Sequence, residues 1–422
     1  MAGAPMAIDA IAALAIVGVV IPVAFAASVI FQRYRLPDIL FLLGTGVLLG
    51  PVLHVVDVGA FREMLPFIGI LGVIIVLFDA ALEMRLREVR AGAAIGMTLA
   101  IVVFLLTSGL GTLVGHFVLG LALGHAILLA MAFGGAGVVI IIPLVQALGI
   151  GRRAFTVVTM EAVISDILMV VAIFGFSTAM ALGSADPALL VLKLGQNLLV
   201  GAGVGAAVGF VWGRILDWHE GEKNEYTVTL AILCLLYAAV DVMGGSGPVS
   251  AVAFGVVIGN TRSRSFVDPV GAALPVFSAN LVGFHHEIVF FVRAFFFVGL
   301  GAALDLAIFR QPTFLLGGLL LTLGVVLART TATWLLLRRS GMSGLDRWSV
   351  AMMFPLGLVT AAASVIPSRT FHLAGTEHFP DYAAVVIVMT NLLATAAVFL
   401  LGRPGLQRRM KPATDAQAAP SS

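Results

Sequence analysis

Charged residues are nearly absent from a series of long apolar segments that run along most of this chain. Only 11% of its 422 residues are Asp, Glu, Lys or Arg, whereas a soluble domain is about one quarter charged. A helix that spans a bilayer needs about 20 mostly apolar residues. The pattern therefore predicts an all-α membrane protein that crosses the bilayer many times.

Thirteen segments have the length and composition expected of a span. They are residues 8–31, 38–53, 66–83, 92–119, 124–148, 155–182, 189–213, 226–243, 248–259, 284–304, 313–337, 346–366 and 382–402. The ninth is short, so we expect it to be tilted or partly re-entrant. We assign residues 1–410 to one transmembrane domain. Residues 411–422 are polar and rich in Ala, Pro and Ser, so we expect a disordered tail.

The basic residues are unevenly divided between the two sets of loops that these spans create. Of 24 Lys and Arg residues, 18 lie on one side, the C-terminal tail included, and 3 lie within spans. The opposite side has 3, which are Arg62, Arg310 and Arg369. Because loops rich in Lys and Arg stay in the cytoplasm, we expect an outside N-terminus, a cytoplasmic C-terminus and insertion in the plasma (inner) membrane. No basic residue precedes Arg33, so the first span is expected to be retained rather than cleaved.

Two short patterns recur seven spans apart. The second and ninth spans share a pair of glycines four residues apart, and the third and tenth spans end in a similar Ala-Ala-Leu-acidic sequence. An odd shift reverses the direction in which a span crosses the membrane, so the match predicts two inverted six-helix repeats. The repeats are residues 8–182 and 226–402, with a linker helix at residues 189–213.

Residues that disrupt helices occur at corresponding places in the two predicted repeats. The fifth span contains Gly134, Gly135, Ala136 and Gly137, and the twelfth contains Pro355 and Gly357. Proline removes a backbone donor and glycine weakens a helix. Paired broken helices of this kind form the midplane ion site of many transporters. Close packing of small residues between helices is the alternative explanation for each glycine.

A few ionisable side chains lie inside the predicted spans, where an ionised group is costly and is therefore a functional candidate. These residues are Asp79, Glu161, Asp166, Arg293 and Arg329, and Ser165 directly precedes Asp166. Asp166 lies near the middle of its span. A buried carboxylate is poorly solvated when charged, so it takes up either a proton or a hard monovalent cation such as Na⁺. Competition for one carboxylate would couple the movements of the two ions.

The other polar groups have supporting roles in this interpretation. We expect Ser165 to offer a neutral oxygen ligand to the cation at Asp166. Glu161 either contributes to the ion site or, as we favour, pairs with Arg329 as a fixed ion pair. Asp79 and Arg293 are supporting charges, although a hydrogen bond to a helix end is an equal alternative for Asp79.

Several other functions have no support in the sequence. The single cysteine, Cys234, forms no internal disulfide and provides no metal-binding cluster. There is no basic run interleaved with aromatic residues, as nucleic-acid binding would favour. There is also no nucleotide-binding fingerprint and no catalytic triad. We therefore expect no enzymatic activity, no cofactor and no nucleic-acid partner.

Six motifs, taken in order, resemble those of the cation/proton antiporter superfamily, the monovalent sodium/proton exchangers. They are LPD with following glycines and proline at 36–51, FDAALE at 78–83, EAVISD at 161–166, FFFVGL at 295–300, LAR at 327–329 and GLV at 357–359. The resemblance implies that Asp166 carries the ions and that Glu161 and Arg329 form a supporting ion pair. It also implies alternating access in a homodimer, with a mobile core of spans 3–5 and 10–12 and elements of spans 6 and 13.

The chain departs from the family pattern at three places. The fifth-span break has Gly135-Ala136-Gly137 where the family usually has Thr-Asp-Pro. Ser165 replaces the usual Asn, and Leu356 replaces an arginine. One hydroxyl ligand and one carboxylate are therefore missing, and we expect Arg293 to provide the positive charge that Leu356 lacks.

These observations predict antiport of a monovalent cation, with Na⁺ favoured, against H⁺. Because Asp166 is the only acidic member of its dipeptide, we expect one proton per cation. One alternative is K⁺/H⁺ exchange or K⁺ efflux, with a possible separate regulatory subunit. A second alternative is a membrane sensor or scaffold that kept the fold and does not transport.

Overall fold

The computed structural model describes residues 10–34, 36–54, 58–83, 93–181, 187–218, 224–261 and 279–402. Within these ranges the chain forms fifteen α-helices and no strand, which confirms the predicted all-α class. The helices are α1 (Ala10–Tyr34), α2 (Asp38–Val47), α3 (Val58–Glu83), α4 (Ala93–Leu113), α5 (Leu123–Met131), α6 (Val138–Leu148), α7 (Arg152–Ala181), α8 (Pro187–Trp218), α9 (Glu225–Val242), α10 (Gly247–Thr261), α11 (Ala279–Ala303), α12 (Pro312–Leu337), α13 (Gly344–Met352), α14 (Leu358–Arg369) and α15 (Phe379–Leu401). The predicted tail, residues 411–422, lies outside the described residues.

The number of predicted spans agrees with these helices. If α5 with α6 and α13 with α14 each count as one interrupted span, the described part of the chain contains the thirteen predicted segments. Turns of π-helix, Leu48–Val52 and Val114–Val118, continue α2 and α4. Helices such as α3 and α8 extend beyond the apolar segments because backbone hydrogen bonding continues past the stretch that hydropathy detects.

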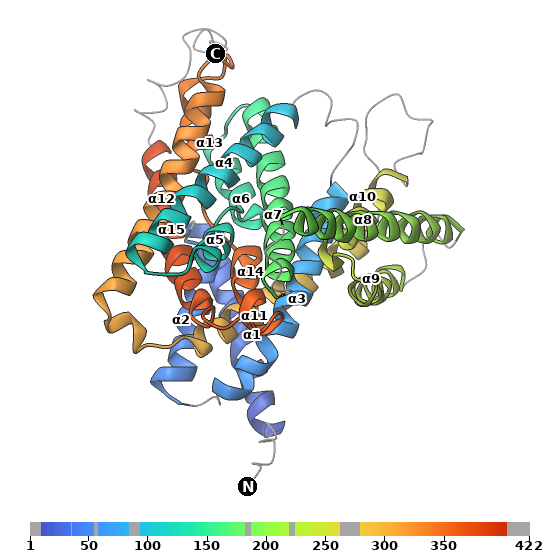
Figure 1. The fold of residues 1–422 in the computed structure, drawn as a ribbon, viewed down its shortest axis with the longest axis horizontal. Coiled ribbons are helices and arrows are strands. Elements are labelled where there is room, and N and C mark those ends of the chain that lie inside the picture. The colour runs from blue at the N-terminus through green and yellow to red at the C-terminus, as the bar shows by residue number, and fades with distance from the viewer. Residues whose placement is uncertain are drawn as a thin grey trace, which may run out of the picture.

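Contacts between the helices divide them into two groups, and Figure 1 shows α8, α9 and α10 projecting to one side of the molecule. One group contains α4, α5, α6, α7, α12, α13, α14 and α15, and we call it the core bundle. In the other group, α10 packs against α8 and α3, while α11 packs against α2 and α3. We call this group, with α1 and α9, the panel bundle. The expected mobile core included α3 and α11, the third and tenth spans. Their packing instead places both in the panel bundle, although α3 also contacts α14 of the core bundle.

Glycines that repeat in sequence make equivalent contacts in the panel bundle. Gly46 of α2 and Gly50 of the π-helical turn that continues it approach the backbone of α11 so closely that a Cβ atom at Gly50 would lie 2.7 Å from the Ala302 carbonyl oxygen. Gly255 and Gly259 of α10 approach the end of α3 in the same way. The second span thus packs on the tenth and the ninth on the third, which is the reciprocal arrangement that an inverted repeat requires.

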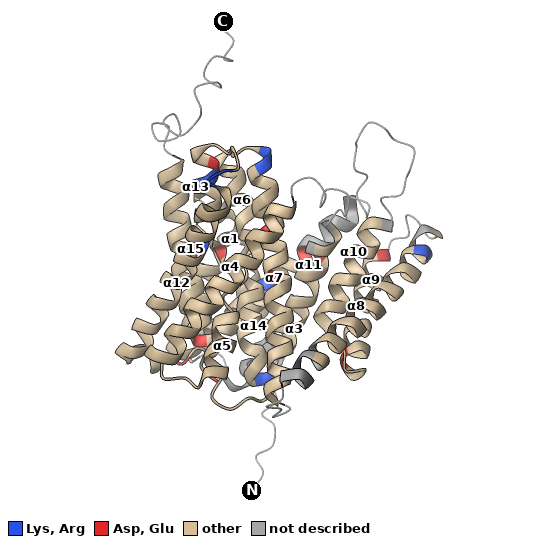
Figure 2. Ribbon diagram, turned by 45° about the horizontal axis from the view of Figure 1, so that its top comes forward, with Lys and Arg blue, Asp and Glu red and all other residues tan. Residues whose placement is uncertain are grey.

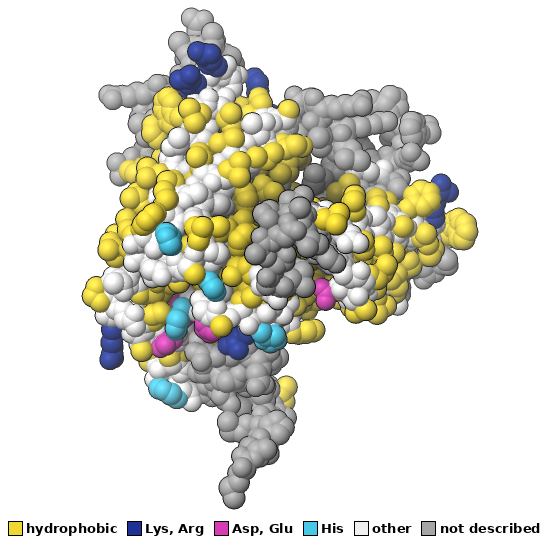
Figure 3. All heavy atoms as spheres, in the orientation of Figure 1, with side chains coloured by type: hydrophobic (Ala, Val, Ile, Leu, Met, Phe, Trp, Pro, Cys, Tyr) yellow, Lys and Arg dark blue, Asp and Glu magenta, His cyan; other side chains and the backbone are white. Residues whose placement is uncertain are grey.

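The outer surface is suited to lipid. Figure 3 shows hydrophobic side chains over much of the visible face, with Lys and Arg toward its margins. Exposed side chains on several helices are large and apolar, including Phe25, Leu105, Leu199 and Leu235. Figure 2 shows most charged residues near helix ends and a few at mid-height of the molecule.

The contact between α2 and α11 depends on the absence of a side chain at Gly46. We expect Gly46→Ala to lower stability by about 1–3 kcal/mol, because the added methyl group collides with the backbone of Val298 and Ala302. Gly44 lies in the same helix and has nothing within 4 Å of an added Cβ atom, so Gly44→Ala is the matched control. Thermal unfolding in detergent measures both variants, and equal midpoints would contradict this packing.

Candidate ion-binding site

Two interrupted helices cross near the middle of the molecule. Helix α5 ends at Met131 and α6 begins at Val138, while α13 ends at Met352 and α14 begins at Leu358. The breaks meet where the Gly137 N–H donates to the Pro355 carbonyl over 2.9 Å. A Cβ atom at Gly137 would lie 3.1 Å from the Gly357 nitrogen, so glycine permits this close approach. Both interruptions lie where the glycine and proline residues predicted them.

Asp166 faces this crossing from the continuous helix α7. Its Oδ1 atom accepts a hydrogen bond of 2.9 Å from the Ala136 N–H, and the residue is only 3% exposed. A Cβ atom at Gly135 would lie 2.5 Å from the same oxygen, so any larger residue would displace the carboxylate or the loop. The sequence-predicted carboxylate and the predicted α5–α6 break are therefore in direct contact.

A small cavity adjoins the Asp166 carboxylate. Its volume of about 20 Å³ is enough for one water molecule or one dehydrated cation. The core bundle contributes Asp166 and residues of both breaks, and the panel bundle contributes Ile39, Val76, Val289 and Arg293. The cavity thus lies between the two bundles, with an acidic residue on one wall and a basic residue on the other.

Ser165 is close to Asp166 in sequence but is oriented differently. Its hydroxyl donates to the Ala162 carbonyl over 3.0 Å, and the residue is fully buried. Among the described residues that line the cavity, Asp166 is present and Ser165 is not. The structure therefore does not bring the Ser165 hydroxyl to the place where an ion would contact Asp166.

Glu161 and Arg329 form a buried ion pair with two hydrogen bonds. The Arg329 Nη1 and Nη2 atoms donate to the two Glu161 oxygens over 2.7 and 2.6 Å. The Arg329 Nε–H donates to the Val350 carbonyl, in the last turn of α13, over 3.2 Å. Both charged residues are almost fully buried, as the expected fixed pair requires. The pair connects α7, α12 and the first half of the broken α13–α14 span.

The remaining predicted supporting charges, Arg293 of α11 and Asp79 of α3, lie in the panel bundle. Arg293 Nη2 lies 2.7 Å from the Asp38 Oδ2 atom at the start of α2. Arg293 is thus paired within the panel bundle and does not stand in the place of the arginine that Leu356 replaces. Asp79 is partly buried and interacts electrostatically with Tyr226 of α9. Asp79 does not line the cavity beside Asp166.

Two residues of α15 support the α13–α14 break and were missed in the sequence. The Asn391 side-chain amide donates to the Leu356 carbonyl over 2.8 Å, and the Leu356 N–H donates to the Thr390 hydroxyl over 3.4 Å. Buried backbone groups without partners are costly in a membrane, so these side chains stabilise the interruption. The sequence feature that could have identified them is a polar dipeptide in the middle of an otherwise apolar span.

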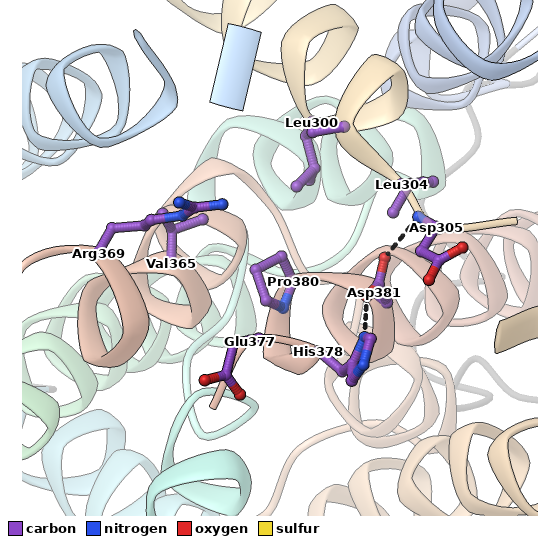
Figure 4. A pocket seen from close by; sticks show the side chains of 10 residues that line it. Leu300, Leu304, Asp305, Val365, Arg369, Glu377, His378, Pro380 and Asp381 are labelled. Carbon is purple, nitrogen blue, oxygen red and sulfur yellow. Dashed lines mark hydrogen bonds and ion pairs between the residues drawn. The ribbon is translucent and has the colours of Figure 1, made fainter. Parts of the chain in front are cut away.

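A second and larger cavity lies between the bundles near the opposite end of α14 (Figure 4). It has a volume of about 260 Å³ and is lined by Leu300, Asp305, Arg369, Glu377 and Asp381, among others. Asp381 accepts a hydrogen bond of 3.1 Å from the Asp305 N–H and lies 2.9 Å from the His378 Nδ1 atom.

The residues that line this cavity are different from those that line the cavity at Asp166. Hydrogen bonds from the backbone N–H groups of Glu377 itself and of Gly375 lower the pKa of the Glu377 carboxyl in the larger cavity.

The chain is similar in sequence and in fold to known proteins. Residues 17–402 match the family model described as "Sodium/hydrogen exchanger, transmembrane". The Na(+)/H(+) antiporter 1 of Methanocaldococcus jannaschii is 24% identical over 390 residues, which are 87% of this chain and 86% of that protein. The K(+)/H(+) antiporter NhaP2 of a Shewanella species is 22% identical over 392 residues, 89% of this chain and 64% of that protein. A solved structure of the sodium proton antiporter MjNhaP1 from Methanocaldococcus jannaschii has the same fold, with a TM-score of 0.76 and 20% identity over 94% of this chain and 98% of that one.

The buried ion pair gives a stability prediction. Arg329→Met should destabilise the protein by about 3–5 kcal/mol, because the substitution leaves the Glu161 carboxylate buried without its partner. Adding Glu161→Gln should restore part of the loss, since the double variant contains no unpaired charge. Arg339→Met, at an exposed residue just beyond the end of α12, is the matched control. Thermal unfolding of the unmodified protein, the two single variants, the double variant and the control tests the coupling, and additive effects of the two single substitutions would contradict it.

Proposed function

Because the chain belongs to the sodium/hydrogen exchanger family, whose members are membrane transporters and not enzymes, we propose that it exchanges Na⁺ for H⁺ at the Asp166 carboxylate. The single observation that carries this assignment is the position of Asp166 at the crossing of two broken helices, beside a cavity that can hold one ion. A carboxylate buried inside a multi-pass membrane fold would have few polar groups competing with it for a cation, which supports the proposal.

The geometry supports competition between the two ions for one group. The Ala136 N–H holds the Asp166 Oδ1 atom in place and leaves Oδ2 available to a proton or a cation. Either one neutralises the carboxylate, and a charged empty carboxylate is disfavoured in a poorly solvated cavity. The carrier therefore crosses between its two states with Asp166 occupied by one ion or the other. This constraint couples the movement of Na⁺ to that of H⁺, and no second binding site is needed for the coupling.

The division into two bundles supports alternating access. The Asp166 cavity and the larger cavity both lie between the core bundle and the panel bundle, near opposite ends of α14, and along α11 they adjoin its middle and its C-terminal end. Movement of the core bundle against the panel bundle would close one cavity and open the other to the solution on its side of the membrane. The contact between Asp305 of the panel bundle and Asp381 of the core bundle would break during this movement.

The wider organisation follows from the same proposal. We propose inverted repeats over residues 8–182 and 226–402, supported by the reciprocal glycine packing of α2 on α11 and of α10 on α3. We also propose an outside N-terminus in the plasma membrane, from the distribution of basic residues, and a homodimer, from the family resemblance. A separate regulatory subunit belongs to the K⁺ alternative.

K⁺/H⁺ exchange is the second candidate function. One relative of similar extent carries the name of a K⁺/H⁺ antiporter. The α5–α6 break also presents Gly135, Ala136 and Gly137, which have no side-chain oxygen to replace the tightly held water of a small cation. K⁺ gives up its hydration water more easily than Na⁺. The absence of side-chain oxygens at the break would therefore weaken K⁺ binding less than Na⁺ binding.

Transport by proteoliposomes tests the assignment of Asp166. With a pH-sensitive dye inside, the unmodified protein should exchange H⁺ for Na⁺, and parallel assays with K⁺ and Li⁺ establish selectivity. Asp166→Asn should reduce exchange to the level of empty vesicles while thermal unfolding still shows a folded protein. Asp241→Asn, at an exposed carboxylate of α9, should retain exchange. Exchange by Asp166→Asn would show that the site is elsewhere, and inactivity of the unmodified protein with all three ions would favour the non-transporting sensor.

Stoichiometry is a separate prediction. The α5–α6 break carries Ala136 and the α13–α14 break carries Leu356, so neither adds a titrating charge, and Glu161 is held by Arg329. One carboxylate changes its occupant in each cycle, which gives one H⁺ for one Na⁺. Exchange should therefore generate no membrane potential and should be insensitive to valinomycin with K⁺ clamped on both sides. A potential measured by a voltage-sensitive dye would require a second titrating group.

A further inference from the structure

A fixed positive charge lines the cavity into which the transported cation must enter. Helix α11 places Arg293 on the wall that the panel bundle contributes, and Asp166 lines the same cavity from the core bundle. A guanidinium remains protonated at any physiological pH. In a poorly solvated space, an uncompensated guanidinium would repel Na⁺. It would also attract the Asp166 carboxylate and neutralise its charge in place of the transported ion.

Asp38 removes this conflict. Its Oδ2 atom lies 2.7 Å from Arg293 Nη2, and the side chains of Asp38 and Arg293 are 3% and 14% exposed, so the carboxylate is buried and the guanidinium mostly so. Asp38 is the first residue of α2, where the helix N-terminus favours a negative charge. Among the described charged residues that line the cavity or pair with its lining, Asp166 and Asp38 are negative and Arg293 is positive. The sum is one negative charge, which matches one monovalent cation or one proton.

We propose that Asp38 and Arg293 set the cation affinity of the Asp166 site, with Asp38 acting as a positioning residue that neutralises the guanidinium. The proposal rests on the function assigned above to Asp166. It goes further by naming the pair that adjusts the electrostatic potential of the cavity. Neither member needs to touch the transported ion, because the potential of a buried charge extends across a cavity of this size.

A purely structural salt bridge between α2 and α11 is the competing explanation. That interface already has a close contact, since Gly46 and Gly50 bring the two backbones together. The hydrogen bonding of the guanidinium is also incomplete, because the buried Arg293 Nε atom has no partner among the described residues. A bridge that served stability alone would be expected to satisfy each buried donor. The position of the pair at the cavity wall is better explained by an electrostatic role.

Single variants of the pair should change transport in opposite directions. Asp38→Asn leaves the guanidinium uncompensated, so the apparent KM for Na⁺ should rise by about tenfold or more and the pH profile of exchange should move to lower pH. Arg293→Gln leaves two negative charges, so the KM should fall or stay low and the profile should move to higher pH. In the double variant the charge sum is that of the unmodified protein, so the KM and pH profile should return toward their original values.

The experiment combines exchange in proteoliposomes with Na⁺-dependent thermal stabilisation in detergent, which reports binding directly. Asp346→Asn, which removes a carboxylate that accepts the Gly151 N–H far from the cavity, is the matched control and should leave the KM unchanged. Shifts of opposite sign, with recovery in the double variant, support the proposal even if each single variant is less stable.

Two results overturn the proposal, and they differ from a failure of the assigned function. If both single variants lose stability but retain the original KM and pH profile, the pair is only structural. If both shift the KM in the same direction and the double variant is worse, charge balance is not the cause. Failure of the Asp166 assignment has its own signature, which is that Asp166→Asn still exchanges Na⁺ or is still stabilised by it.

Discussion

The buried pair of Glu161 and Arg329 is the interaction on which the rest of the core bundle depends. The guanidinium makes two hydrogen bonds to the carboxylate of α7 and one to a carbonyl at the end of α13. An ionised side chain inside a membrane is tolerated when it is paired and its hydrogen bonds are satisfied. This one contact thereby fixes the helix that carries Asp166 against one half of the interrupted span that crosses it.

The crossing itself is held together mainly by backbone groups. A helix break inside a membrane exposes amides and carbonyls that water cannot reach, and each of them requires a partner. Gly137 and Pro355 supply partners for each other, Ala136 donates to Asp166, and the Asn391 and Thr390 side chains of α15 bond to Leu356. The Asp166 carboxylate is therefore oriented by a backbone amide, although the break lacks the side-chain hydroxyl and the second carboxylate of the family pattern.

Sequence reasoning was most successful where the determining physics is local. Apolar length locates the spans, and Gly134–Gly137 with Pro355 locates the breaks, because both effects act within a few residues of the chain. The partner of Arg293 was missed because Asp38 lies 255 positions away and at the edge of its span, where an acid usually faces water. Membership of α3 and α11 in the panel bundle was also missed, because it depends on backbone contacts across glycines that resemble many others in an apolar sequence. The Ser165 hydroxyl donates to the Ala162 carbonyl of its own helix, and its role as an ion ligand stays a prediction.

The contact between Asp305 and Asp381 has a consequence for how such transporters diverge. The donor in this contact is a main-chain amide, which every residue except proline carries, so the bond between the bundles requires no particular side chain at position 305. The same holds for the amide of Ala136 at the candidate ion site. Contacts of this kind produce no correlated substitutions between their two positions. A comparison of sequences alone would then identify the carboxylate of each contact but not the residue whose backbone N–H donates to it.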